Sequence, residues 1–366
     1  MSLISSASLA EFSRAEISTR KKHVNIISKY LGGADNSPLF LCGEALEVLS
    51  SMPSNCVDMA MTSPPYWGHR EYGVDGIGLE LEPQDYVESL VAVFRELHRV
   101  LKPTGSFWLN IGDTYTNKCL QGIPWRIALR LTDDIGFILR NDVIWHKVKG
   151  GMDQSKDKLR NTHEHLFHFV KQRSYFYNAD ALRNKPRTAI VLNGRVVSAT
   201  GVSGIKYKRQ IELSTSLSSS EKVAALNALD NELQKISLGE ISDFRMIIKG
   251  EQRATHSDGE KVSGRARELK EKGFYFLRYH PNGAKMGDVW DIMPEDTKRS
   301  HKHYAAYPED LCKRPIASTC PPNGVVLDPF CGTGTTMKVA CSFGHRSIGI
   351  DLSADYIAIA KERVTA

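Results

Sequence analysis

The sequence predicts an α/β fold in which a twisted, mostly parallel β-sheet carries helices on both faces. Short apolar runs such as Cys56–Met61 and Val325–Leu327 stop at turn residues, as buried strands do. Amphipathic segments of helical period separate several of these runs, and this alternation is typical of parallel sheets. The chain has 366 residues, of which 41% are hydrophobic and 25% charged. This ordinary globular composition is enough for one large α/β domain and a smaller one.

Charge and cysteine content narrow the class of protein further. The net charge is +6 and the pI is about 8.8, which is compatible with a polyanionic partner. The seven cysteines form no C-x-x-C pair and no cysteine–histidine metal spacing, so free thiols in a reducing cytosol are the simplest interpretation. No apolar run reaches membrane-spanning length, and the N-terminus lacks an apolar core of signal-peptide type. We therefore expect no association with a membrane.

The stretch Thr62–Trp67 follows a predicted buried strand and contains two consecutive prolines. Proline lacks an N–H and holds the preceding residue extended, so neither a strand nor a helix continues through this stretch. The carbonyls of Ser63 and Pro64 can then point into a cavity at the end of the strand, beside the Ser63 hydroxyl. An exocyclic amine on a planar base needs such acceptors and a flat ring, which the aromatic residues that follow can offer. A Pro-Pro turn with two core aromatics would explain the stretch equally well.

The stretch Val325–Thr336 predicts a strand, a glycine-containing turn and the start of a helix. Gly332 and Gly334 let the backbone approach a ligand, and the first turn of the helix exposes N–H groups. The next predicted strand, Arg346–Asp351, ends in a carboxylate. An acidic residue about 20 positions after such a turn suits ribose hydroxyls. The spacing G-x-G-x-x-G is absent, so this is not the dinucleotide-binding fingerprint.

Together, Thr62–Trp67 and Asp328–Thr336 resemble the motifs of the S-adenosylmethionine-dependent DNA amino-methyltransferases. The S-P-P-Y motif precedes the cofactor turn, which is the permuted order of the beta group of these enzymes. Protein-glutamine and most RNA amino-methyltransferases carry the glycine-rich turn first, so the motif order argues against them. The resemblance runs from about Leu39 to the end, with a gap of about 100 residues. It implies a Rossmann-like methyltransferase sheet, S-adenosyl-L-methionine as cofactor and double-stranded DNA as partner.

The resemblance also assigns roles to the residues that match its motifs. It implies that the catalytic residues are Ser63, Pro64, Pro65 and Tyr66. The residues implied for cofactor binding are Asp328, Pro329, Phe330, Cys331, Gly332, Thr333, Gly334, Thr335 and Asp351, with Glu44 near the adenine and Tyr307 in a stretch that borders the methionine end.

The first half of the chain predicts these elements in order. Residues 1–37 form an N-terminal extension with a helix from about Ser8 to Tyr30. Then come a strand at Leu39–Glu44, a helix at Ala45–Met52, a glycine-rich mobile loop at Gly68–Leu81, a helix at Pro83–Leu101 and a strand at Ser106–Ile111. Arg70, in the loop, could meet a DNA phosphate. Asn110 and Asp113 could serve the pocket, although a strand-end turn alone explains them.

A helix at Ile123–Ile135 and a strand within Gly136–Lys147 follow, and Leu166–Lys171 predicts a second strand. His163-Glu164-His165 is expected in the loop before that second strand. The histidines at 146, 163, 165 and 168 invite a metal hypothesis. His165 and His168 do not face the same side of a strand, so we expect no metal site.

The region from residue 183 to residue 285 is polar, and its basic residues outnumber its acidic ones. One helix is predicted, at Ser220–Ile236. The region occupies the place where the resembling family keeps its target-recognition region, so position and charge favour DNA recognition over a solvated insertion. The candidate DNA-binding residues here are Lys206, Lys208, Arg209, Arg265 and Arg267.

The expected organisation is therefore an extension (1–37), a catalytic half (38–182), a target-recognition region (183–285) and a cofactor-binding half (286–366). In the last part, Pro308–Thr319 predicts the helix before the cofactor strand, and Ser353 caps a final helix at Ala354–Val364.

The predicted function is site-specific methylation of cytosine N4 in DNA, by base flipping and direct transfer. In the resembling family, S-P-P-Y usually accompanies cytosine N4, and D-P-P-Y accompanies adenine N6. Adenine-N6 methylation and a catalytically silent DNA-binding protein on the same fold are the alternatives. The family also implies a restriction-modification system with a partner endonuclease, a prokaryotic cytosol or nucleoid location, and a homodimer as one option.

Overall fold

The computed structural model describes residues 14–33, 35–68, 76–149, 155–184, 190–192, 195–197, 204–250, 264–295 and 307–365. The chain divides into two compact units. The first comprises Met1–Ala181 with Gly287–Ala366, and the second comprises Leu182–Met286. The boundaries expected from composition, at residues 183 and 285, differ from these by one residue each.

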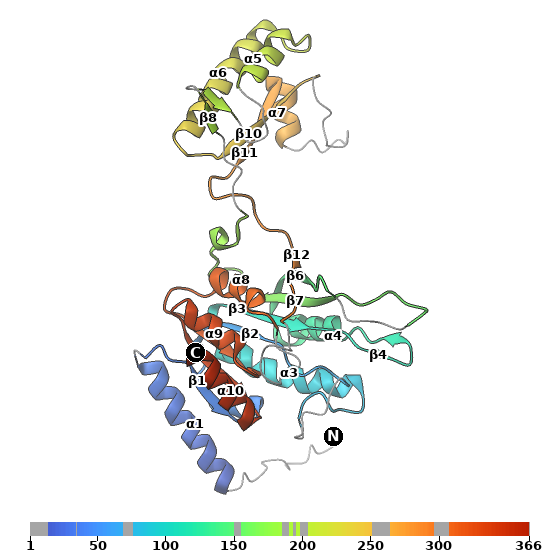
Figure 1. Ribbon diagram of the computed structural model, residues 1–366, viewed down its shortest axis with the longest axis vertical. Helices are drawn as coiled ribbons and strands as arrows, with labels where there is room; N and C mark the ends of the chain where they lie inside the picture. The colour runs from blue at the N-terminus through green and yellow to red at the C-terminus, as the bar shows by residue number, and fades with distance from the viewer. Residues whose placement is uncertain are drawn as a thin grey trace, which may run out of the picture. The chain divides into compact units, whose positions relative to one another are not determined.

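The first unit is built on an eight-stranded sheet with the order β1-β14-β13-β2-β3-β7-β6-β12 (Figure 1). The strands are β1 (Leu39–Cys42), β2 (Val57–Thr62), β3 (Leu101–Ile111), β6 (Ile138–His146), β7 (His163–Val170), β12 (Val289–Asp291), β13 (Val325–Asp328) and β14 (Arg346–Asp351). Every adjacent pair is parallel except the two that involve β7. The predicted α/β class with a mostly parallel sheet is confirmed.

This topology brings the carboxyl ends of seven strands to one edge of the sheet. Because β7 runs the opposite way, its amino end reaches the same edge. The residues that follow β1, β2, β3, β13 and β14 therefore meet there, although they lie far apart in the sequence. An open parallel sheet binds its ligands at this edge.

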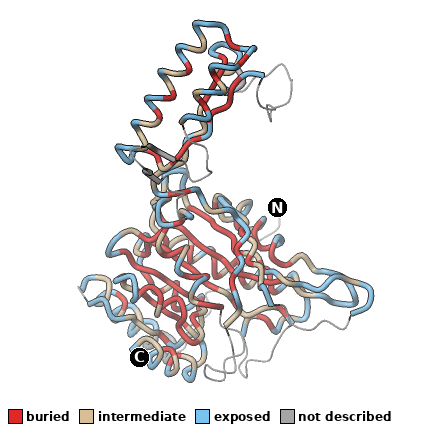
Figure 2. The backbone as a smooth tube through the Cα atoms, turned by 45° about the horizontal axis from the view of Figure 1, so that its top comes forward, coloured by how far each residue is buried: buried red, intermediate tan, exposed pale blue. Residues whose placement is uncertain are grey.

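Two layers of helices cover the sheet. Helices α2 (Ala45–Ser50), α3 (Pro83–Val100) and α4 (Ile123–Arg130) pack against one another as one layer, and α8 (Glu309–Thr319), α9 (Thr335–Ser342) and α10 (Ala354–Thr365) form the other. A short hairpin of β4 (Tyr115–Thr116) and β5 (Cys119–Leu120) lies between β3 and α4 in the chain. The buried residues concentrate in the strands and on the inner faces of the helices (Figure 2).

Helix α3 shows how the sequence forms this layer. Pro83 occupies its first turn, where a missing N–H costs nothing. Tyr86, Leu90, Phe94 and Leu97 recur at helical spacing, and all four are fully buried. The helix is therefore fixed by its apolar stripe, as its sequence predicted.

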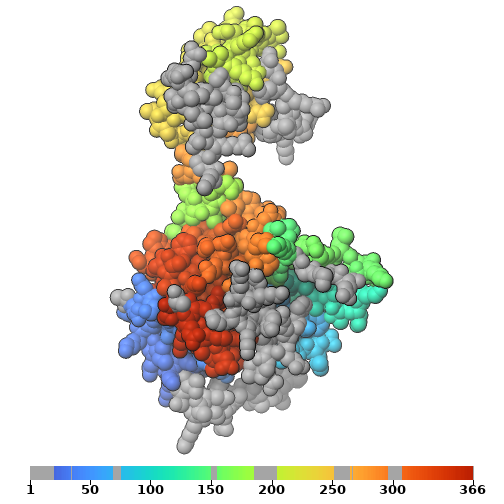
Figure 3. Space-filling model, in the orientation of Figure 1, coloured from blue at the N-terminus to red at the C-terminus, as the bar shows by residue number. Residues whose placement is uncertain are grey.

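Helix α1 (Arg14–Gly32), blue in Figure 3, lies beside C-terminal residues drawn in red. The guanidinium of Arg346 donates to the carbonyls of Leu31 and Gly33, at 3.2 and 3.1 Å. The Tyr30 hydroxyl donates to the carbonyl of Ser347 at 3.1 Å. The predicted start of this helix, near Ser8, lies outside the described residues. None of the described helices is long and apolar enough to cross a membrane.

The loop predicted for His163-Glu164-His165 is wrong. These residues begin β7, where His163 pairs with His146 and Glu164 pairs with Trp145. Polar residues are tolerated at this end of the strand because His163 is exposed, and Glu164 and His165 have hydrogen-bond partners. The predicted helix Ile123–Ile135 is also modified, since α4 ends at Arg130 and continues as a π-helical turn, η1 (Leu131–Ile135).

The second unit contains more structure than the one predicted helix. Its elements are η2 (Ala179–Leu182, at the boundary), β8 (Ile190–Leu192), β9 (Arg195–Val197), α5 (Gly204–Leu213), α6 (Ser219–Ser237), β10 (Asp243–Ile248), α7 (Gly264–Lys272) and β11 (Phe274–Tyr279). Tyr207, Leu229 and Met246 belong to its apolar core. Helix α6 matches the prediction, and Ser218 forms a capping box with Glu221 at its start. Helices α5 and α7 were missed because charged residues interrupt their apolar period.

Candidate active site

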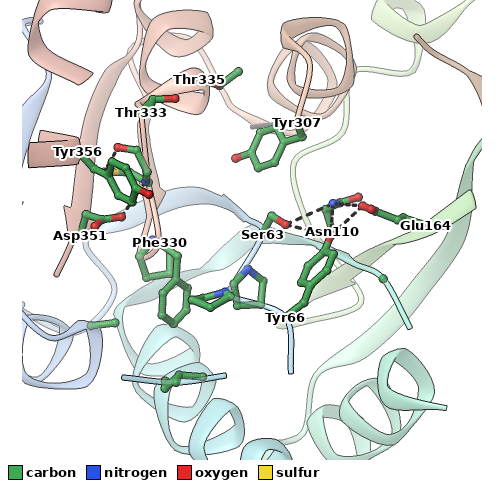
Figure 4. Close-up of a pocket in the computed structure, with 18 of the residues that line it drawn as sticks. Ser63, Tyr66, Asn110, Glu164, Tyr307, Phe330, Thr333, Thr335, Asp351 and Tyr356 are labelled. Carbon is green, nitrogen blue, oxygen red and sulfur yellow. Dashed lines mark hydrogen bonds between the residues drawn. The ribbon is translucent and has the colours of Figure 1, made fainter. Parts of the chain in front are cut away.

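A cavity of about 490 Å³ opens at the carboxyl edge of the sheet in the first unit. Its volume lies within the range of small-molecule sites, about 300–1,000 Å³. Figure 4 shows Ser63, Tyr66, Asn110 and Glu164 gathered on one side, with Asp351 and Tyr356 opposite. Both sequence motifs therefore reach one cavity.

The S-P-P-Y turn is held from two sides. The Thr62 hydroxyl donates to the carboxylate of Asp328 at 2.6 Å, which ties the end of β2 to the end of β13. The Tyr86 hydroxyl donates to the carbonyl of Pro65 at 2.7 Å. Ser63 and Pro64 line the cavity between these two anchors. Helix α3 thus fixes the turn that carries the predicted catalytic residues.

Ser63 and Tyr66 belong to a polar network at the cavity wall. The Ser63 hydroxyl donates to the Tyr66 oxygen at 3.2 Å, and the Tyr66 hydroxyl donates to Oε2 of Glu164 at 2.7 Å. The Asn110 amide nitrogen donates to the Tyr66 oxygen at 3.0 Å and to Glu164 at 2.8 Å. Lys147 forms an ion pair with the other oxygen of Glu164. These groups come from β2, β3, β6 and β7 or from the residues next to them.

Tyr66 stays a neutral phenol in this setting. Burial, followed by the nearby Glu164 carboxylate, raises the pKa of its hydroxyl well above the ordinary value. Its ring packs on Gly112, where an added Cβ would lie 3.0 Å from a ring carbon. The ring position is therefore set by both its hydroxyl and its face.

Asp328 does not line the cavity but holds in place the residues that do. Its side chain is buried and accepts from Thr336 at 2.6 Å and from Tyr307 at 2.9 Å, in addition to Thr62. Burial raises the pKa of Asp328, and the hydroxyl donors oppose that shift. This carboxylate therefore joins the Pro-Pro turn, the glycine turn and Tyr307 into one support.

The glycine turn forms the opposite wall. The turn residues that line the cavity are Pro329, Phe330, Cys331, Gly332, Thr333 and Thr335. Gly334 does not line it. Its φ is +78°, and a Cβ at this position would lie 2.9 Å from the Cβ of Ala360, so this glycine serves helix packing. The backbone N–H of Gly332 donates to Asp351 at 2.9 Å.

Asp351 and Glu44 both line the cavity. The Asp351 carboxylate also accepts from the Ser353 N–H at 2.9 Å, and burial raises its pKa. Glu44 caps helix α2 by accepting from the Glu47 N–H at 2.8 Å. Both side chains therefore line the cavity while they accept hydrogen bonds from the backbone.

Glu295 lines the cavity and is paired with Arg363, and neither residue belongs to the sequence motifs. Arg363 donates to the Thr333 hydroxyl at 2.6 Å and to Oε1 of Glu295 at 3.3 Å. Glu295 Oε2 is buried without a hydrogen-bond partner among the described residues. A buried acceptor beside the cavity fits a ligand that carries an ammonium group.

None of the predicted DNA-binding residues that the structure describes lines this cavity. Arg70 is outside the described residues. Lys206 and Arg209 are exposed on α5, whereas Lys208 is paired with Asp230 at 2.9 Å. Arg265 and Arg267 belong to α7, and Arg265 is exposed there.

The histidines have separate roles in the described part of the chain. His146 contacts Asp291 at 2.7 Å, His165 contacts Asp142 at 2.9 Å, and His168 contacts the Ser106 hydroxyl at 3.1 Å. Within the described ranges, no cluster of three or more His, Cys, Asp or Glu side chains is arranged to hold a metal ion.

Glu164 and Lys147 are the main cavity residues that the sequence predictions missed. The expectation of a loop at 163–165 removed Glu164 from consideration. The signal that could have found it is a polar residue just before the apolar run Leu166–Val170, on a strand expected to pair with the catalytic part of the sheet.

The fold and the cavity at its sheet edge fit the class expected from the sequence motifs, the S-adenosylmethionine-dependent methyltransferases. A family model described as DNA methylase, of the N6 and N4 type, matches residues 57–362. The chain belongs to this family, whose cofactor is S-adenosyl-L-methionine. It is a DNA methyltransferase.

Among its relatives is the type II methyltransferase M.SfiI of Streptomyces fimbriatus, 31% identical over 86% of this chain and 88% of the relative. Type II methyltransferase M.SmaI of Serratia marcescens is 26% identical over 88% of this chain and 89% of the relative. A solved structure named PvuII DNA methyltransferase (cytosine-N4-specific) is 18% identical, with a TM-score of 0.49 over 91% of this chain and 93% of that one.

Proposed function

We propose that the enzyme transfers a methyl group to the exocyclic N4 of cytosine in double-stranded DNA. The observation that carries this proposal is the hydroxyl of Ser63 at the cavity wall, at the place that a carboxylate takes in a D-P-P-Y motif. A neutral acceptor can bind the cytosine amine without a full negative charge beside the ring.

The residues present fit the cofactor. Asp351 offers its carboxylate to ribose hydroxyls, and the unpartnered oxygen of Glu295 can accept from the ammonium of the methionine part. Thr333 and Thr335 also line the cavity, in the glycine turn. When bound, S-adenosylmethionine supplies an activated methyl group on its sulfonium.

The protein's own residues orient the amine and accept hydrogen bonds from it. A base amine is a poor nucleophile because its lone pair is delocalised into the ring. Ser63 Oγ accepts a hydrogen bond from one amine hydrogen, and the Pro64 carbonyl accepts one from the other. These two bonds favour a rehybridised nitrogen whose lone pair is free to react. The Tyr66 ring holds the base by stacking. Because the amine is inaccessible within a duplex, the cytosine must be flipped into the cavity.

The second unit is the proposed target-recognition region. Its basic residues, Lys206, Arg209, Arg265 and Arg267, can neutralise DNA phosphates. The relatives are named type II methyltransferases, and this supports a place in a restriction-modification system with a cognate endonuclease. The homodimer expected as one option stays a prediction.

The experiment that tests the base is nucleoside analysis of DNA methylated by the purified enzyme. N4-methylcytosine is the expected product. N6-methyladenine as the sole product would overturn the base assignment and leave the family intact. No methylated nucleoside, with cofactor and DNA both bound, would favour a silent DNA-binding protein. Modification-sensitive sequencing of the same DNA would give the recognition sequence.

A further inference from the structure

Methylation of an amine releases a proton, and the cavity contains a route for it. The sulfur–carbon bond of the donor breaks, a nitrogen–carbon bond forms, and the amine must lose one hydrogen as a proton. A base amine that has gained a methyl group and a positive charge is a strong acid, so a carboxylate can accept its proton. A carboxylate connected to the amine by hydrogen bonds can serve as this acceptor.

Glu164 is connected to Ser63 through one intermediate group. The Ser63 hydroxyl donates to the Tyr66 oxygen at 3.2 Å, and the Tyr66 hydroxyl donates to Glu164 Oε2 at 2.7 Å (Figure 4). Ser63 is the residue proposed to accept from the base amine. The three side chains therefore form a continuous chain from the amine to a carboxylate.

Asn110 sets the direction of this chain. Its amide nitrogen lies 3.0 Å from the Tyr66 oxygen and 2.8 Å from Glu164 Oε2, and a nitrogen of this kind only donates. If the amide were reversed, its oxygen would face the carboxylate, which is unfavourable. The Tyr66 oxygen therefore accepts from Asn110 and Ser63, and its own hydrogen points to Glu164. Each donor in the chain points away from the base.

The negative charge of Glu164 is paired with a cation, and this ion pair is partly exposed to solvent. Its side chain is 10% exposed, and its other oxygen pairs with Lys147, whose side chain is 30% exposed. The Lys147 ammonium also lies 5.0 Å from the centre of the Trp145 ring. Water can therefore reach the Lys147 end of the pair and remove a proton after the reaction.

We propose that Ser63, Tyr66 and Glu164 form the exit path for the proton of the methylated amine, with Glu164 as its final acceptor. The amine proton moves to Ser63 Oγ, the Ser63 proton moves to the Tyr66 oxygen, and the Tyr66 proton moves to Glu164 Oε2. No group is oxidised or reduced, and the carboxyl then returns the proton to water. Glu164 reaches the base only through two other side chains, so it is a positioning residue and not a catalytic one. This inference rests on the proposed function.

The competing explanation is that Glu164 only holds Tyr66 in place. Glu164→Gln separates the two, because an amide oxygen still accepts from Tyr66 but cannot hold the proton. We expect a single-turnover rate about 100-fold lower, the order of a lost general base. If Glu164 only holds Tyr66, E164Q should instead keep a rate within twofold of wild type, because the glutamine oxygen preserves that hydrogen bond.

Two further variants make the test specific. Glu164→Asp keeps a carboxylate at a shorter reach, so it should recover part of the rate that E164Q loses. Asp142→Asn is the matched control, since Asp142 lies on β6 of the same hairpin, contacts His165 and does not line the cavity. D142N should behave as wild type. Calorimetry of cofactor binding, with an unchanged Kd in E164Q, shows that the cavity is intact.

Tyr66→Phe breaks the chain at its middle while keeping the ring. The double variant Y66F/E164Q should be no slower than Y66F alone, because the two residues act as one path. The proposal is overturned if the rate losses of Y66F and E164Q multiply in the double variant. It is also overturned if the E164Q rate is within twofold of wild type. If the wild type produces N6-methyladenine, the base assignment fails but the exit path is still tested, because either amine loses a proton.

Discussion

At the scale of single residues, the site is a set of polar groups that support one another. Asp328 is the central example, because one buried carboxylate accepts from Thr62, Tyr307 and Thr336. Its neighbours in the turn line the cavity, whereas Asp328 itself lies beneath. A motif residue can therefore matter to a cofactor site without being available to contact the cofactor.

Ser63→Ala should lower the turnover number by about 100-fold, the order seen when one preorganised hydrogen-bonding group is lost from a transition state. The bond from Ser63 to the amine matters most as the nitrogen rehybridises, so the Kd of S-adenosylmethionine and of DNA should stay unchanged. Single-turnover kinetics with both binding titrations test this. A Kd for DNA that rises as much as the rate falls would place Ser63 in binding rather than in catalysis.

Asp351→Ala should weaken S-adenosylmethionine binding about 10- to 100-fold, the range for a hydrogen bond to a charged group. The same change removes the bond to the Gly332 N–H, so part of the loss belongs to the turn. Asp351→Asn is the control, because its amide oxygen keeps one acceptor. We expect the asparagine variant to fall between wild type and alanine in a calorimetric titration. Equal affinity in all three would remove Asp351 from the site.

The buried side chain of His168 should make the free energy of unfolding sensitive to acid. Burial lowers the pKa of this histidine to about 3, so the folded state stays neutral where an unfolded histidine, with a pKa near 6.5, binds a proton. The free energy of unfolding should therefore fall as pH drops below 6.5, by up to about 1.4 kcal/mol per pH unit. His168→Phe can keep the stack on Trp108, whose ring centre is 4.2 Å away, and should flatten this dependence. Urea titrations from pH 7 to pH 5 measure it. The same slope in both proteins would assign the acid sensitivity to other groups.

At the scale of elements, strand β7 and helix α10 contribute residues to the site that the two sequence motifs do not include. Strand β7 runs against its neighbours and brings Glu164 to the cavity. Helix α10 carries Arg363, which joins the Thr333 hydroxyl to Glu295. Both elements act through side chains placed by packing, and neither carries a recognisable motif.

Helix α5 carries the basic cluster expected to contact DNA. Replacing Lys206, Lys208 and Arg209 with alanine should weaken DNA binding and reduce the slope of log K against log salt by about 2, since each phosphate contact contributes about 0.9. The pair between Lys208 and Asp230 makes a full loss of three contacts unexpected.

The matched control for this cluster removes three positive charges from helix α1, with alanine at Arg20, Lys21 and Lys22. This control should change the salt slope less than the α5 variant. Filter binding over a salt series gives both slopes, and cofactor affinity should be the same in all proteins. An unchanged slope in the α5 variant would show that its cluster is a solvated surface.

At the scale of the whole molecule, the second unit is an insertion with closely spaced ends. Arg183 and Lys285 pair as an antiparallel bridge, and the Asn184 N–H donates to the Ala284 carbonyl at 2.9 Å. The cavity is lined by residues of the first unit. Cofactor binding and DNA recognition are therefore carried by separate parts of the chain in the proposed function.

Replacing Leu182–Met286 with a short glycine-serine linker should leave S-adenosylmethionine binding within about threefold of wild type, a change under about 0.7 kcal/mol. The same deletion should abolish methylation of DNA. Calorimetry and a methyl-transfer assay on one preparation provide the two readouts. Retained site-specific methylation would show that target recognition lies in the first unit.

The fold class, the strand-to-helix order of the catalytic part and the two motifs that meet at the sheet edge could all be predicted from the sequence. These features depend on short-range causes, namely the apolar period of helices such as α3, the backbone limits of Pro64 and Pro65, and the turn at Gly332.

Other features became visible only in the folded chain. They are the position of Glu164, the buried place of Asp328, the packing role of Gly334 and the extra helices α5 and α7. Several of these depend on a partner far away in the chain, as Thr62 is 266 residues from Asp328 and Asn110 is 54 residues from Glu164. Hydrogen bonds of this kind leave no periodic pattern in a sequence, because pairing across a sheet is set by how the whole chain packs.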